Sequence, residues 1–285
     1  MIFINPAENR LRAGWRILFT TAFIFSLLIV FSLFVQSRAT LMAGLAVIVL
    51  LVLLFSSVAL DKRPFRDFGF ELSGRWIVDF FAGNIIAILS ISFIVLMKVW
   101  AGWLAFNSVT THIFSRTILL ELTNMLILMT AISVWEEAYF RGYLITNLKE
   151  GFHLGKISKK WVMVAAVMAA ALIFGIAHAN NPNATILSII NISAAGIVLA
   201  YPYIKTGSMA IPVGMHLSWN FFQGTVFGLP VSGVDMEETI VTTTVTGPDL
   251  FTGGMFGPEG GLLGLTGLIV MVMISYLYLF MFYKK

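Results

Sequence analysis

The 285-residue chain contains no cysteine, and Asp, Glu, Lys and Arg together make up only 11% of it. The absence of cysteine excludes disulfides, thiolate metal sites and a cysteine nucleophile. The net charge of +4 comes from scattered lysines and arginines, without the basic stripe that nucleic-acid binding requires. We therefore expect no nucleic-acid partner.

Long apolar runs dominate the chain, and hydrophobic residues account for 59% of it. The runs are continuous and about 20 residues long, the length of a transmembrane helix, and they lack the alternation of a β-barrel strand. We predict an all-α polytopic membrane protein with about eight transmembrane helices and a single integral membrane domain, residues 1–285. The predicted spans are about 14–35, 41–60, 76–97, 116–149, 161–178, 184–204, 209–227 and 262–282.

Lysine and arginine are concentrated at alternate ends of the predicted spans. The N-terminal segment, the loops after the second, fourth and sixth spans, and the C-terminus contain nearly all of them, and the opposite loops hold little beyond Arg38, Lys98 and Arg116. Because basic loops stay in the cytoplasm, we expect both termini there and a multi-pass protein of the cell membrane. Segment 229–261 has no basic residue and is expected to be an acidic extracytoplasmic loop.

Two adjacent carboxylates, Glu136 and Glu137, follow the apolar run 118–134, and Arg141 comes one helical turn later. A charged side chain at the centre of a membrane helix costs roughly 2.5 to 3.5 kcal/mol, so these residues are candidates for function. Glu137 and Arg141 are four apart and can pair on one helix face. Glu136 is rotated by about 100° and is free to face a cavity, where a carboxylate can take a proton from water. The alternative is an ion pair at the membrane surface.

Two later helices carry further polar residues. Phe174 and His178 share one helix face at a spacing of four, and so do His216 and Asn220. A buried histidine in a membrane helix needs a partner or a wet cavity. Taken singly, His178 fits a helix end, and Asn220 fits a hydrogen bond between helices. The other two histidines, His112 and His153, fall in predicted loops and are expected to be solvated.

The motifs Glu136-Glu137-x-x-x-Arg141, Phe174-x-x-x-His178 and His216-x-x-x-Asn220, in this order on about eight spans, resemble the CAAX protease and bacteriocin-processing family of intramembrane endopeptidases. The Ras-converting CAAX prenyl endopeptidase is one of its members. The resemblance covers about Leu119 to Gly228, and the segment Asn9 to Arg16 also looks like the usual start of the family. It implies a catalytic core at about 116–228.

The resemblance implies a role for each motif. Glu136 is expected to be the general base, with His178 helping it to hold and deprotonate a water. His216 and Asn220 are expected to donate hydrogen bonds to the oxyanion, and Glu137, Arg141 and Phe174 to support the site. The substrate is then a peptide or protein, with prenylation or another membrane anchor as open alternatives, and the site is expected to face the cytoplasmic side.

A zinc-dependent version of the same hydrolysis stays open, because Glu136, His178 and His216 form a two-histidine, one-carboxylate set. The HExxH signature of many zinc proteases is missing. We favour hydrolysis without a cofactor. Two alternatives from other classes also remain: a proton-coupled transporter, and a non-catalytic immunity or scaffold protein. The sequence does not determine the oligomeric state.

The depth of His216 presents a difficulty, because it lies only about 13 Å from the end of its helix at Gly207. Glu136 and His178 lie roughly 21 Å and 27 Å from the basic ends of their helices. Either the helix of His216 begins nearer the membrane centre, or the helices tilt around a cavity open to the cytoplasm. We favour the tilt.

Overall fold

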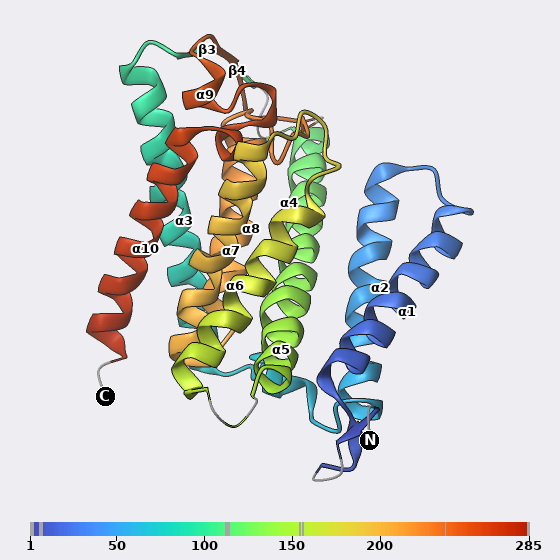
Figure 1. Ribbon diagram of the computed structural model, residues 1–285. Helices are drawn as coiled ribbons and strands as arrows, with labels where there is room; N and C mark the ends of the chain where they lie inside the picture. Colours follow the sequence, from blue (N-terminus) through green and yellow to red (C-terminus); the bar gives the residue numbers. More distant parts are fainter. Residues whose placement is uncertain are drawn as a thin grey trace.

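The computed structural model describes residues 3–5, 8–111, 115–153, 155, 157–236 and 238–283. His112 lies outside these ranges. The described part of the chain forms a helical bundle (Figure 1). Its α-helices are α1 (Ala13–Ser32), α2 (Arg38–Ala59), α3 (Gly74–Trp100), α4 (Arg116–Glu136), α5 (Ile145–Gly151), α6 (Lys159–Ala177), α7 (Ile186–Thr206), α8 (Ala210–Phe221), α9 (Asp249–Thr252) and α10 (Leu262–Phe282).

Seven helices within the described residues are long and apolar enough to cross a membrane, which confirms the predicted all-α polytopic class. One of them is a continuous 36-residue helix, Arg116–Gly151, in which the π-helix η2 (Glu137–Leu144) joins α4 to α5. The remaining predicted span, 209–227, consists of α8 and the π-helix η3 (Phe222–Val226). It is shorter than the others and largely buried among them.

Helix α8 packs closely against α3 through two glycines. A Cβ atom at Gly83 would lie 2.4 Å from the carbonyl oxygen of Ile211, and one at Gly214 would lie 2.2 Å from that of Phe80. Small residues let two helix backbones approach to this distance. The contact fixes the position of α8, and with it His216 two residues after Gly214.

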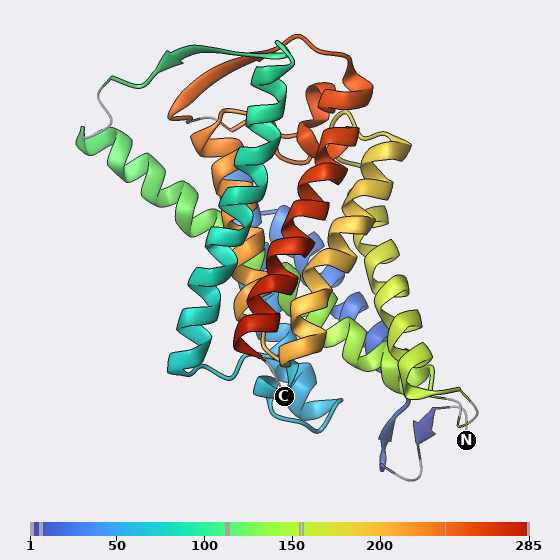
Figure 2. The same ribbon diagram turned by 90° about the vertical axis from the view of Figure 1, so that its left-hand side faces the viewer.

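Helix α8 is preceded by a turn in which Gly207 is exposed and Met209 is buried. Met209 is fully buried, its amide donates to the Gly69 carbonyl at 2.9 Å, and its side chain contacts the place where Gly142 would carry a Cβ. Gly142 is about 13 Å along the helix from its end at Gly151. The preference for tilted helices stays a prediction, and α4 is strongly inclined to α3, as such a tilt requires (Figure 2).

The α1–α2 hairpin is joined to the end of α5 by buried charges. Arg16, 1% exposed, pairs with the fully buried Asp61 at 3.1 Å, and it also contacts Glu150, which Arg10 and Arg63 contact as well. Burial raises the pKa of the Asp61 carboxyl, and the Arg16 guanidinium opposes this. A short pair of strands, β1 (Ile4–Asn5) and β2 (Arg10–Leu11), precedes α1.

Segment 229–261 is more ordered than a simple loop. Strand β4 (Val241–Val245) pairs antiparallel with β3 (Leu104–Val109), and α9 is followed by the short 3₁₀ turns η4 (Gly254–Phe256) and η5 (Pro258–Gly260). A further 3₁₀ turn, η1 (Phe65–Phe68), lies between α2 and α3. Strands β3 and β4 lie at the end of the bundle opposite to both chain termini (Figures 1 and 2).

Candidate active site

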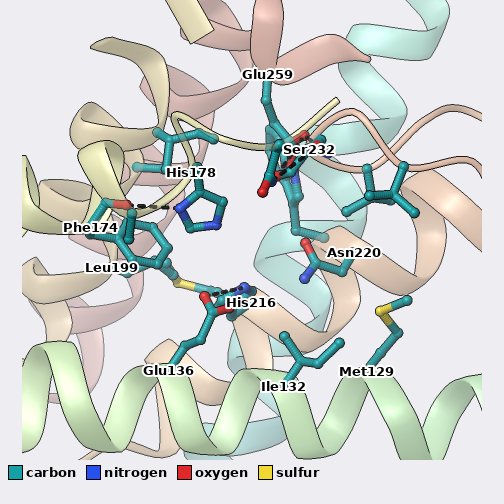
Figure 3. A pocket seen from close by; sticks show the side chains of 18 of the residues that line it. Met129, Ile132, Glu136, Phe174, His178, Leu199, His216, Asn220, Ser232 and Glu259 are labelled. Carbon is teal, nitrogen blue, oxygen red and sulfur yellow. Dashed lines mark hydrogen bonds and ion pairs between the residues drawn. The ribbon is translucent and has the colours of Figure 1, made fainter. Parts of the chain in front are cut away.

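The three motifs meet at one cavity, to which separate helices contribute (Figure 3). Glu136 is the last residue of α4, His178 follows the end of α6, and His216 and Asn220 lie on α8. All four side chains line a cavity of about 520 Å³. The structure thus brings together polar residues that are up to 84 positions apart in the sequence (136 to 220).

Glu137 lies at the centre of the charged part of the site. Its Oε1 is 3.0 Å from Nη1 of Arg141, so the pair predicted from the spacing is present. The same oxygen is 2.8 Å from Nδ1 of His216. Glu137 is fully buried and Arg141 is 1% exposed. Arg141 also lies over the ring of Phe174, 4.1 Å from its centroid. The pair is therefore enclosed by protein on all sides.

Glu136 approaches the other nitrogen of the same imidazole. Its Oε2 is 3.8 Å from Nε2 of His216, which is too long for a direct hydrogen bond. This oxygen accepts no hydrogen bond from any described residue. A water molecule bridges groups at such distances in many protein sites. Glu136 and Glu137 thus lie at the two nitrogens of one ring.

The sequence predicted an α-helix through this motif, with Glu136 and Glu137 turned well apart. The structure instead changes to a π-helix at Glu137, and π-turns often occur at functional sites. The helix of His216 changes in the same way at Phe222, two residues after Asn220. The looser i→i+5 winding is compatible with both carboxylates facing His216. Sequence periodicity gave no signal for either π-turn.

His178 is held by its own helix end. Its Nδ1 lies 2.8 Å from the carbonyl oxygen of Phe174, which can only accept a hydrogen bond, so Nδ1 is the donor. In the neutral ring, Nε2 is therefore an acceptor. Figure 3 shows the imidazole directed into the cavity, on the far side of His216 from Glu136. The ring of Phe174 lies beside both imidazoles. Its centroid is 4.8 Å from the ring centroid of His178 and 6.4 Å from that of His216.

Asn220 lies one helical turn after His216, and its carboxamide points into the cavity (Figure 3). It is 8% exposed, as are Glu136 and His216. A buried amide with a free N–H group can donate to a charged oxygen in a dry site. The spacing His216-x-x-x-Asn220 therefore places two possible donors along one wall.

The cavity lies toward the end of the bundle that carries segment 229–261. Ser232, Asp235 and Glu259 line it, whereas no described residue of the basic connections or of the two termini does. The cytoplasmic side of the termini and of the site stays a prediction, and segment 229–261 marks the end of the bundle opposite to the termini (Figure 1).

Among the described residues, no group of three His, Asp or Glu side chains is arranged to hold a metal ion. Nδ1 of His178 donates to a carbonyl, Nδ1 of His216 faces Glu137, and only the Nε2 atoms face the cavity with Glu136. Nδ1 contacts of this kind also hold histidines that bind metal through Nε2, so the zinc-dependent alternative stays a prediction.

Sequence reasoning treated Glu259 only as one acid of a loop. The structure places it on the cavity wall, where it accepts a hydrogen bond from Trp219, the residue before Asn220. Ser232 and Asn181 join it through further hydrogen bonds. No motif marks these residues, since their contacts connect segments that are far apart in the chain.

Comparisons with known proteins agree with the motif analysis. No curated protein and no solved structure matches the chain. Residues 118–222 match the family described as type II CAAX prenyl endopeptidase Rce1-like, and this segment contains Glu136, His178, His216 and Asn220. The match supports an intramembrane endopeptidase of the CAAX type and confirms the family that the three motifs resemble.

Proposed function

We propose that the protein hydrolyses a peptide bond inside the membrane, in a membrane-associated or lipidated substrate. The observation that carries this proposal is the convergence of Glu136, His178, His216 and Asn220 on one cavity. The family match at residues 118–222 supports the same reaction class. The wall of the cavity is otherwise largely apolar, which suits a hydrophobic substrate segment.

In the proposed reaction Glu136 is the general base. It takes a proton from a water molecule while the water oxygen attacks the scissile carbonyl carbon. Nε2 of His178, an acceptor in the neutral ring, helps to hold that water. When the tetrahedral intermediate collapses, the C–N bond breaks and Glu136 returns the proton to the leaving amine. The products are a carboxylate and an amine.

The negative charge that develops on the carbonyl oxygen must be stabilised by hydrogen-bond donors. Asn220 donates from its amide group, and His216 donates from Nε2. Because Nδ1 of His216 already faces Glu137 at 2.8 Å, Nε2 can donate only in the doubly protonated imidazolium. That cation would lie between Glu136 and Glu137. One oxyanion donor typically contributes about 3 to 4 kcal/mol in a dry site.

The proposed reaction uses no metal. A sample of the purified protein should therefore keep its activity after treatment with a chelator, and metal analysis should find less than one equivalent of zinc. Loss of activity with the chelator, restored by stoichiometric zinc, would contradict this part of the proposal.

Cleavage of a quenched fluorescent peptide tests the proposal as a whole. The purified protein is assayed in detergent and in liposomes, with prenylated and unprenylated versions of one peptide. We expect the wild type to cleave and Glu136→Gln, which keeps the shape of the side chain, to lose about 10²- to 10⁴-fold in kcat. Glu121→Gln on the same helix is the matched control, because Glu121 does not line the cavity.

Three results would point elsewhere. Cleavage that survives Glu136→Gln would remove the general base from the proposal. Proton flux into liposomes without cleavage would favour the transporter alternative. A folded wild type that neither cleaves nor transports would favour an immunity or scaffold protein. Cleavage of the prenylated peptide alone would define the substrate as lipidated.

A further inference from the structure

A third carboxylate lies on the wall of the cavity, opposite Glu136. Glu259 belongs to η5, three residues before the start of α10, and lines the same cavity as the residues of the proposed reaction. Figure 3 shows its side chain across the cavity from Glu136, with His178 and Asn220 between them.

Both oxygens of Glu259 accept hydrogen bonds from different parts of the chain. Nε1 of Trp219 on α8 donates to Oε1 at 3.1 Å. The amide nitrogen and the hydroxyl of Ser232 donate to Oε2 at 2.6 Å and 3.3 Å. The backbone is held as well, since Asn191 on α7 donates to the carbonyl oxygens of Glu259 and Gly261, both at 2.9 Å.

These contacts connect Glu259 to the residues of the proposed reaction on both sides. Trp219 directly precedes Asn220 on α8. On the other side, the side-chain Nδ2 of Asn181 donates to the Ser232 carbonyl oxygen at 2.9 Å. The backbone amide of Asn181 donates to the His178 carbonyl oxygen at 3.1 Å. One carboxylate thus joins α8 to the turn that carries His178.

The turn after His178 is held on one side by α6, because the amides of His178 and Ala179 donate to the carbonyls of Gly175 and Ile176. It contacts the Ser232 loop very closely, because a Cβ at Gly233 would lie 1.9 Å from the carbonyl oxygen of Pro182. Gly233 has φ +84°, a conformation that glycine adopts readily. The two loops therefore fit against each other in one arrangement, which Glu259 connects to α8.

The carboxyl group of Glu259 is also part of the cavity wall. Burial raises the pKa of its carboxyl group, and the hydrogen bonds from Ser232, Gln223 and Trp219 oppose this, together with the nearby His178. A group held by several donors on a cavity wall differs from the other acids of its segment. Glu238, for example, is exposed.

We propose that Glu259 is a positioning residue of the site, which holds the turn bearing His178 and the part of α8 bearing Asn220 at the separation that hydrolysis requires. This inference rests on the proposed peptidase function. Glu259 does not contact the reacting atoms in this scheme and acts through Trp219 and Ser232. Small displacements of catalytic groups can reduce a rate by about a hundredfold, so the effect on turnover should be large.

The test uses Glu259→Gln in the full-length protein, with Glu238→Gln as the matched control from the same segment. For folded, monodisperse protein, we expect Glu259→Gln to lower kcat about tenfold to a hundredfold while KM changes by less than about twofold. Glu238→Gln should match the wild type. A loss of activity that only follows a loss of folded protein would assign Glu259 a purely structural role and overturn the proposal.

A second variant separates positioning from folding. Trp219→Phe keeps an aromatic ring and removes only the donor to Oε1. If Glu259 acts through Trp219, kcat should fall in this variant too, and the double variant should lose less than the product of the two single effects. Fully multiplicative effects would overturn the proposed route through Trp219, and this variant also serves as the test if Glu259→Gln does not fold.

The wild type distinguishes this inference from the proposed function. The role of Glu259 alone would be overturned if the wild type cleaves, Glu136→Gln does not, and Glu259→Gln keeps the wild-type kcat. A folded wild type without any cleavage would overturn both.

Discussion

The buried pair of Glu137 and Arg141 allows stability and catalysis to be separated by substitution. Arg141→Met removes the cation and leaves Glu137 fully buried, with its Arg141 partner gone. Removing one member of a buried ion pair typically costs about 3 to 5 kcal/mol, because the remaining charge is uncompensated. At about 2 to 4 °C per kcal/mol for a chain of this size, the melting temperature should fall by roughly 6 to 20 °C.

The double variant Glu137→Met, Arg141→Met should reverse much of this loss. Replacing both members of a buried pair by apolar residues of similar volume is often neutral for stability. Activity should nevertheless stay low, because His216 loses the carboxylate that lies 2.8 Å from its Nδ1. An unoriented imidazole is a poorer oxyanion donor, and we expect kcat to fall about 10²-fold or more.

Thermal unfolding in detergent, followed by light scattering, and cleavage of the quenched peptide measure the two effects on the same samples. Glu121→Gln serves as a control for the removal of a carboxylate from α4. A double variant that regains stability and also cleaves at the wild-type rate would refute the reasoning, because Glu137 would then matter only as the partner of Arg141.

Three further predictions follow from the site and its surroundings. Asn220→Ala should lower kcat about 10²- to 10³-fold with little change in melting temperature, as measured by the peptide assay; an unchanged kcat would exclude Asn220 as a donor. Gly214→Ala should destabilise the protein by about 1 to 3 kcal/mol in thermal unfolding, since its Cβ would lie 2.2 Å from a backbone oxygen of α3, whereas Gly74→Ala has open space and should be neutral. Because the chain has no cysteine, Ser232→Cys and Lys62→Cys can each be labelled as a single cysteine in intact cells. An impermeant maleimide should reach the two cysteines from opposite sides of the membrane, with Lys62→Cys protected from outside. Labelling of both cysteines from one side would contradict the topology.

The membrane helices could be predicted from the sequence. Predicted spans and observed helices agree closely, as with the eighth span, 262–282, and α10 (Leu262–Phe282), because apolar runs of this length have one stable form in lipid. The pair of Glu137 and Arg141 was also predictable, since residues four apart on a helix are neighbours wherever the helix lies.

The start of α8 was predicted within one residue, at 209 against Ala210, but its contact with Gly69 was not predicted. This contact joins Met209 to a residue 140 positions away, and no local pattern in the chain indicates it. The π-turn at Glu137 likewise has no counterpart in the hydrophobic period, so the sequence separated two carboxylates that both face His216.

The sequence by itself determined the class of the protein, the positions of its membrane helices and the residue types of its motifs, because burial in lipid and helical spacing act locally along the chain. Only the tertiary structure decided that Glu137 contacts His216, 79 positions away, and that Glu259 reaches the same cavity from a loop. Such contacts depend on how closely whole helices pack, as at Gly83 and Gly214, and this packing brings distant residues together without leaving a periodic signal in the sequence.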